Sequence, residues 1–179
     1  MSAFGWWWVR SWGVVAYLAL WGTAFFGLMI STRGAGGWLH TATVGALHRA
    51  WSLLVVVGTA LHVAGVVLDP VSKVPLLATL LPVGPGPIAL GVIAAWWVAL
   101  ARWQRLPRAL WTAVHASAGG AYVVALGHAL TAGTDRGDPV FRAVVLGTAA
   151  ALLAALLYRV AAQPAAPGSS TQRQAPRGT

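Results

Sequence analysis

Four histidines are placed where they could bind metal. His48 and His62 lie 14 residues apart in one apolar stretch, and His115 and His128 lie 13 residues apart in another. In a helix these separations correspond to about 21 and 19.5 Å, most of the thickness of a bilayer, where an ionisable side chain is costly unless something binds it. Imidazole is a common axial ligand of haem iron. Two facing pairs of histidines, at two depths, would suit two haems.

The composition is typical of an integral membrane protein. Only 8% of the 179 residues are charged, against about 25% in a soluble domain. A helix needs about 20 apolar residues to cross a bilayer. The apolar runs predict one all-α integral membrane domain, residues 1–162, a bundle of five transmembrane helices at about 11–32, 42–68, 86–103, 110–132 and 140–161. Residues 163–179, rich in Pro, Ser, Gln and Gly, are expected to be a disordered tail.

The basic residues predict the orientation. In a five-helix topology eight of the twelve Lys and Arg residues fall on one side, which the positive-inside rule assigns to the cytoplasm. The N-terminus is then outside and the C-terminus cytoplasmic, in a multi-pass protein of the plasma (inner) membrane that contacts lipid. His48 and His115 share the cytoplasmic level, and His62 and His128 share the outer level. The net charge of +9 is part of this topology signal, so no nucleic-acid partner is expected.

The sequence also excludes several kinds of chemistry. The chain has no cysteine, which rules out disulfides, thiolate-ligated clusters and covalently attached haem within it. It has no glycine-rich phosphate loop of the nucleotide-binding types. Any redox centre must be held by other ligands.

The two histidines of the helix at 42–68 point in nearly the same direction, whereas those of the helix at 110–132 do not. At about 100° per residue, 14 residues bring His62 to within about 40° of His48, whereas 13 residues leave His128 about 140° from His115. We therefore expect a kink, a local tightening or a supercoil in the helix at 110–132, and Gly119 with Gly120 is a plausible place for it. Small residues near the histidines would leave room for a porphyrin, although glycines also let membrane helices pack closely.

Two segments resemble a known family. The stretches "LHRAWSLLVVVGTALH" (47–62) and "RWQRLPRALWTAVHASAGGAYVVALGHAL" (102–130) resemble the ferric reductase-like transmembrane domain of ferric reductases, NADPH oxidases and the haem-bearing subunit of bacterial methionine sulfoxide reductase systems. The resemblance implies a cytochrome b with two haems b (heme b), ligated by His48 with His115 and by His62 with His128. Arg49 matches the basic residue after the first histidine. The chain departs in having five apparent spans where many members have six, and in lacking a flavin- and nicotinamide-binding domain.

Arg49 and His40 each allow two interpretations. Arg49 is a candidate cofactor-binding residue, because a guanidinium suits a haem carboxylate, but an arginine at a cytoplasmic helix end is also a plain topology signal. His40 precedes the same helix and has no histidine partner at its depth. It is expected to be a loop residue, with a role near the inner haem or a quinone as the less favoured alternative.

These observations predict transmembrane electron transfer, as a component of an oxidoreductase with no catalytic residue of its own. Electrons would come from a separate flavoprotein or a membrane quinol and leave to an acceptor or partner protein on the outer side. One alternative is a haem-bearing anchor subunit of a larger redox complex. Another is a histidine proton relay, but all three acidic residues lie in predicted loops, which favours redox over proton transfer.

Overall fold

Four long helices account for most of the described chain. The computed structural model describes residues 3–32, 40–69, 105–132 and 134–162. They form α1 (Ala3–Thr32), α2 (Thr41–Leu68), α5 (Arg108–Ala132), the short 3-10 helix η2 (Thr134–Gly137) and α6 (Pro139–Ala161). Each of the four long helices is long and apolar enough to cross a membrane. The fold is therefore all-helical and compatible with a multi-pass membrane protein.

The predicted bundle of five transmembrane helices is wrong. Within the described ranges the structure has four helices that could span a membrane. The predicted helix at 86–103 and the predicted tail at 163–179 lie outside the described residues. The number five came from counting apolar runs, and four of these runs coincide with helices that the structure describes.

The helix ends follow from local chemistry. α1 begins at Ala3, not at 11, so Trp6, Trp7 and Trp8 form part of the helix. α6 begins with Pro139 at its first position, where a missing N–H costs nothing, and Asp138 caps it by accepting a hydrogen bond from Phe141 N at 2.9 Å. α2 and α5 begin at Thr41 and Arg108, against expected starts at 42 and 110.

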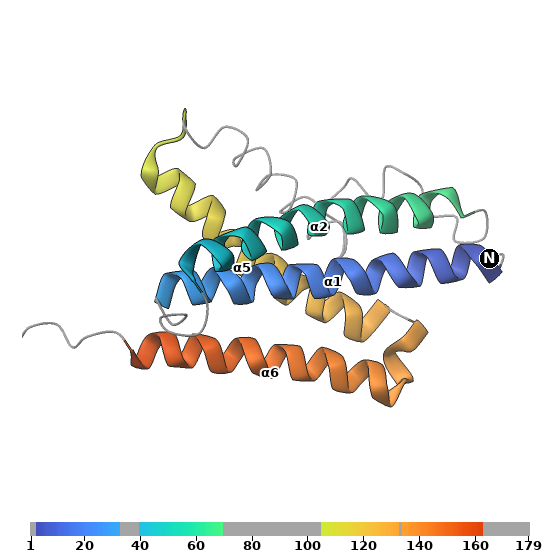
Figure 1. The fold of residues 1–179 in the computed structure, drawn as a ribbon. Helices are drawn as coiled ribbons and strands as arrows, with labels where there is room; N and C mark the ends of the chain where they lie inside the picture. Colours follow the sequence, from blue (N-terminus) through green and yellow to red (C-terminus); the bar gives the residue numbers. More distant parts are fainter. Residues whose placement is uncertain (1–2, 33–39, 70–104, 133, 163–179) are drawn as a thin grey trace, which may run out of the picture.

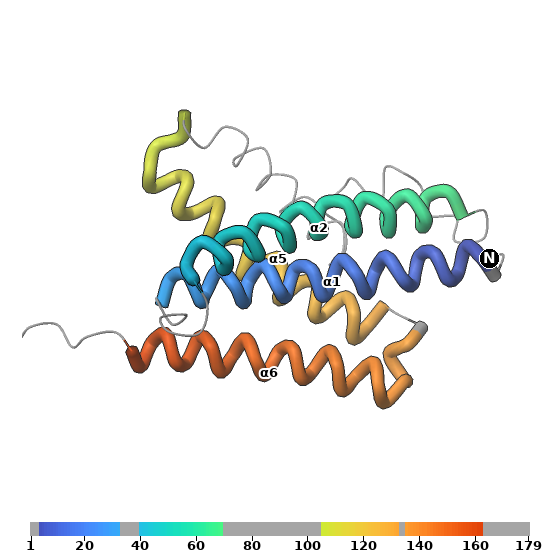
Figure 2. The backbone as a smooth tube through the Cα atoms, viewed as in Figure 1, coloured from blue at the N-terminus to red at the C-terminus, as the bar shows by residue number. Residues whose placement is uncertain are grey.

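α1 is the central helix of the described fold. It packs along α2 and also contacts α5 and α6. α1 and α6 run in one direction, whereas α2 and α5 run in the other, and α5 lies obliquely across the α1–α2 pair (Figures 1 and 2). The histidine-bearing helices α2 and α5 therefore run the same way, as the sequence predicted, which places their corresponding ends together.

The core is small and the outer surface apolar. The buried cluster draws on all four long helices: Tyr17, Ala19, Leu20, Val55, Ala121, Tyr122, Val145 and Leu152. Large apolar side chains such as Leu68, Val123 and Val140 are exposed, and a membrane would cover them with lipid. The α1–α2 contact is close because small residues line it. Gly58 lies against the backbone of Ala16 and Gly22 lies under the indole of Trp51.

Candidate functional site

The structure brings the four predicted histidines together in two pairs. The ring centres of His48 and His115 lie 6.0 Å apart. Those of His62 and His128 lie 6.4 Å apart. Each pair joins α2 to α5, one near the beginning of both helices and one near their ends. All four side chains are half-buried.

These separations suit one metal ion between each pair of rings. An imidazole nitrogen binds a transition metal at about 2.0–2.1 Å, and the ring centre lies about 1.1 Å further on, so two imidazoles on one ion have their centres about 6 Å apart. A plain edge-to-face ring contact has the same separation. A metal site, unlike a plain ring contact, needs a lone pair on the ring nitrogen that binds the metal, here Nε2.

The two α2 histidines are held in the tautomer that a metal requires. His48 Nδ1 lies 2.9 Å from the carbonyl oxygen of Thr23, and His62 Nδ1 lies 2.9 Å from the carbonyl oxygen of Val9. A carbonyl oxygen can only accept, so each Nδ1 must carry the proton and donate it. The lone pair of the neutral ring is then on Nε2, as in metal-binding histidines whose other nitrogen donates to a backbone carbonyl.

Helix α2 packs mainly on α1 and only slightly on α5. α1 makes extensive contact with α2, whereas α2 and α5 have few close backbone approaches. On α5, a Cβ added at Gly119, Gly120 or Gly127 would meet no heavy atom within 4 Å among the described residues. Gly127 directly precedes His128. Among the described residues, these small residues of α5 therefore leave their surface uncovered.

Both histidines of α5 meet a partner on α2 although α5 is not broken. α5 is continuous from Arg108 to Ala132, so the distortion considered at Gly119 and Gly120 does not interrupt it. Its oblique course (Figure 1) instead changes the direction from α5 to α2 between the two levels. His115 and His128, about 140° apart on a straight helix, each meet a partner in this way. His115 also packs against Trp111, with ring centres 5.1 Å apart.

The other predicted residues have different surroundings. Arg49 is exposed, one residue after His48. His40 is the N-cap of α2, where its Nδ1 accepts a hydrogen bond from Ala42 N at 3.3 Å and its carbonyl accepts from Thr43 N at 2.8 Å. The expected loop position of His40 is thus a capping position. A search for Ser, Thr, Asp or Asn before the apolar run would have missed it, because histidine is not a usual cap.

A buried hydroxyl lies beside the His48 level. Thr23, whose carbonyl binds His48, is 3% exposed, and its Oγ1 has no hydrogen-bond partner among the described residues. A buried hydroxyl without a partner costs free energy in an apolar medium. The Thr23 hydroxyl is therefore free to bind a polar group at this level of α1.

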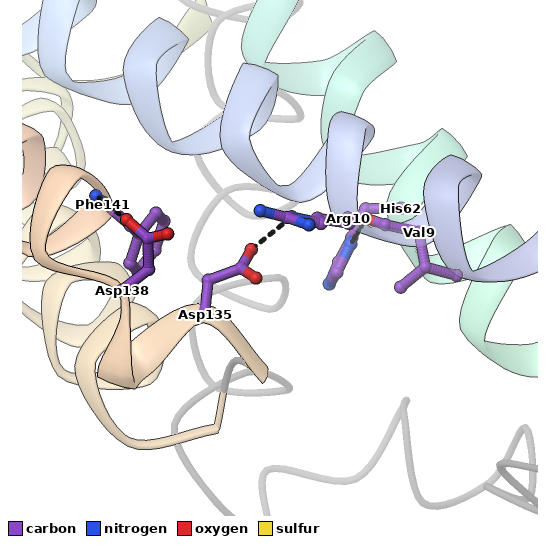
Figure 3. A network of polar contacts seen from close by, with 6 residues as sticks. All are labelled: Val9, Arg10, His62, Asp135, Asp138 and Phe141. Carbon is purple, nitrogen blue, oxygen red and sulfur yellow. Dashed lines mark hydrogen bonds and ion pairs between the residues drawn. The ribbon is translucent and has the colours of Figure 1, made fainter.

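An ion pair lies near His62, at the other end of the helices from His48. Arg10 pairs with Asp135 of η2, and the guanidinium lies 4.7 Å from the ring centre of Trp6. Figure 3 shows Arg10 next to Val9, whose carbonyl holds His62, so one turn of α1 contacts both α2 and the connection between α5 and α6.

Comparison with family models, with curated proteins and with solved structures finds no match to this chain. The resemblance to the ferric reductase-like domain therefore rests on the residues quoted for it, and what it implies for function is a proposal.

Proposed function

We propose that this chain is a membrane electron-transfer protein that holds two b-type haems, one between His48 and His115 and one between His62 and His128. A single observation carries the proposal. Two cross-helix histidine pairs lie at two levels with ring centres 6.0 and 6.4 Å apart, and in each pair the α2 imidazole is fixed with its proton on Nδ1. Among the described residues no group of three or more metal-binding side chains occurs, and a haem needs only two from the protein.

The histidines would do two things for the cofactor. They would hold it between α2 and α5 through the two imidazoles of each pair, which would favour electron transfer over substrate binding. Haem supplies reversible one-electron transfer when bound. The helices around it would keep the two sites at fixed levels. The levels are about 21 Å apart along α2, which gives one site near each face of a bilayer.

The charges at the two helix ends support a direction. Four basic residues lie at the His48 level: Arg49, Arg105, Arg108 and Arg159. No acidic residue lies at that level in the part of the chain that the structure describes. At the His62 level Arg10, Arg136 and Arg142 are accompanied by Asp69, Asp135 and Asp138. By the positive-inside rule the His48–His115 level faces the cytoplasm. Electrons would enter there from a separate flavoprotein or a membrane quinol, and leave from the His62–His128 level to an outer acceptor. The proposed location is the plasma membrane.

A haem count with a reduced-minus-oxidised optical spectrum of the purified protein tests this proposal. We expect two low-spin b-type haems per chain. The His40→Ala variant is the matched control, because His40 caps a helix and should leave both haems in place. A folded, monodisperse preparation without haem would contradict the proposal.

A further inference from the structure

Helix α1 carries no histidine, yet it contacts the histidines of α2 at two equivalent places. The carbonyl of Val9 accepts from His62, and the carbonyl of Thr23 accepts from His48. These carbonyls are 14 residues apart on α1, as the histidines are on α2. Four residues after each carbonyl comes a glycine, Gly13 and Gly27 respectively. The same arrangement therefore occurs twice along one antiparallel helix pair.

Helix geometry explains why glycine follows each carbonyl by four residues. The carbonyl of residue i points along the helix toward the N–H of residue i+4, with which it already forms a hydrogen bond. Because a Cβ tilts toward the N-terminus, the side chain of residue i+4 covers the turn that contains this carbonyl. When residue i+4 lacks a Cβ, a bulky ring can approach this oxygen more closely from the side. Gly13 and Gly27 thus open the carbonyls of Val9 and Thr23 to the imidazoles.

The distances show how closely the rings lie on these glycines. A Cβ at Gly13 would be 3.0 Å from Nδ1 and 3.1 Å from Cε1 of His62. A Cβ at Gly27 would be 3.3 Å from Cε1 and 3.6 Å from Nδ1 of His48. The first contact is too short for the imidazole to stay where it is, and the second requires a smaller shift. At both positions the added Cβ would lie against Nδ1, which donates the hydrogen bond, and against the neighbouring Cε1.

We infer that Gly13 and Gly27 are positioning residues, which let α1 fix the tautomer and the ring orientation of His62 and His48. A protonated Nδ1 leaves Nε2 as the ligating atom, and its hydrogen bond to a carbonyl raises the basicity of the ring. The consequence for haem rests on the proposed function. The consequence for the histidine tautomer does not, because the hydrogen bond belongs to the protein alone.

Alanine substitutions test this inference, with reduction potentials and the EPR spectrum of each low-spin ferric haem as readouts. In Gly13→Ala the signal of the His62–His128 centre should shift and its potential should rise, because a less basic imidazole stabilises ferric iron less. In Gly27→Ala the same changes should appear at the His48–His115 centre, and they should be smaller because that contact is longer. Each variant should leave the other centre unchanged.

Gly58→Ala is the matched control. A Cβ there would meet the backbone of Ala16 at 3.2 Å, in the same helix interface, but it touches no histidine. If Gly58→Ala shifted either centre as much as Gly13→Ala shifts the His62–His128 centre, the glycines would act only through helix packing and the inference would be wrong. Gly27→Ala, with its milder contact, keeps the test open should Gly13→Ala fail to fold.

A second measurement separates this inference from the proposed function. If the purified wild-type protein contained no haem, the proposed function would fail, and the tautomer could still be read from the nitrogen shifts of ¹⁵N-labelled histidine. His48 and His62 should be protonated at Nδ1 in the folded wild-type protein, and Gly13→Ala should move His62 toward a mixture of tautomers. An unchanged Nδ1-protonated His62 in Gly13→Ala would overturn the inference.

Discussion

The hydroxyl of Tyr17 on α1 lies 3.0 Å from that of Tyr122 on α5, in the buried core between the two histidine levels. Tyr17 also contacts Thr148 Oγ1 at 2.7 Å and the carbonyl oxygen of Val145 at 3.2 Å, both on α6. One side chain thus connects three helices at the centre of the described fold. The hydroxyl groups thus find partners within the protein, as the interior of a bilayer would require.

Removing this hydroxyl should destabilise the bundle. Tyr17→Phe should lower the free energy of unfolding in detergent by about 1 kcal/mol, within the range measured for hydrogen bonds between membrane helices. Tyr122→Phe should cost less, because the hydroxyl of Tyr122 has one such contact whereas that of Tyr17 has three. Tyr158→Phe is the control, since Tyr158 is 59% exposed. An equal decrease in the free energy of unfolding in all three variants would contradict a stabilising role of the Tyr17 hydrogen bonds.

The pair of Arg10 and Asp135 should contribute modestly and depend on salt. Both side chains are partly exposed, 32% and 13%, and exposed ion pairs are worth about 0.2–1 kcal/mol. A double-mutant cycle with Arg10→Gln and Asp135→Asn should give a coupling energy in this range, which should shrink at high ionic strength. The exchanged pair, Arg10→Asp with Asp135→Arg, should recover part of the stability. A coupling that salt does not change would contradict the electrostatic origin.

The orientation can be checked with reporter fusions. A reporter joined after Ala162 should be cytoplasmic, because the end of α6 lies at the level of Arg49, Arg105 and Arg108. A reporter joined after Gly137, at the opposite end of α6, should be exported. The reverse result would exchange the proposed entry and exit sides for electrons, while leaving the histidine pairs unchanged.

Much of the fold could be predicted from apolar length, and part of the site from residue spacing. The starts of α2, α5 and α6 lie within two residues of the expected positions. The facing of His48 with His115 follows from equal depth on helices that run the same way. The number of helices was wrong, because hydropathy alone decided it. The angle between His115 and His128 suggested a distorted helix, because the sequence of a single helix does not encode the angle at which α5 crosses its neighbours.

The contribution of α1 could not be predicted from a search for ligands. Gly13 and Gly27 gain meaning only when the register of α1 against α2 is known, since the atoms that they expose are backbone carbonyls. The one signal in the sequence is that these glycines share the 14-residue spacing of His48 and His62. His40 was likewise read by its residue type, whereas its role as a cap depends on the backbone at the start of α2.

Arg49 should influence one centre through its charge. It follows His48 and is exposed, so solvent and salt screen it. Arg49→Ala should keep both haems and lower the potential of the His48–His115 centre by tens of millivolts, because losing a nearby positive charge favours ferric iron. Arg49→Lys should retain most of the wild-type potential. If Arg49→Lys behaved like Arg49→Ala, the guanidinium would act by bidentate hydrogen bonding and not by charge alone.

The pairing itself predicts which histidine variants resemble each other. Replacing either partner of a pair leaves iron with one imidazole and an open position, so both variants of that pair should convert or lose the same haem. His62→Ala and His128→Ala should therefore disturb one centre and keep the other reducible from the cytoplasmic side. His48→Ala and His115→Ala should disturb the other centre and stop electrons at entry. A redox titration of the four variants, with an optical spectrum at each potential, measures this directly. Because the observed pairs each join α2 to α5 at one level, a His48→Ala spectrum that matched His128→Ala instead of His115→Ala would contradict both the pairing and the parallel course of the two helices.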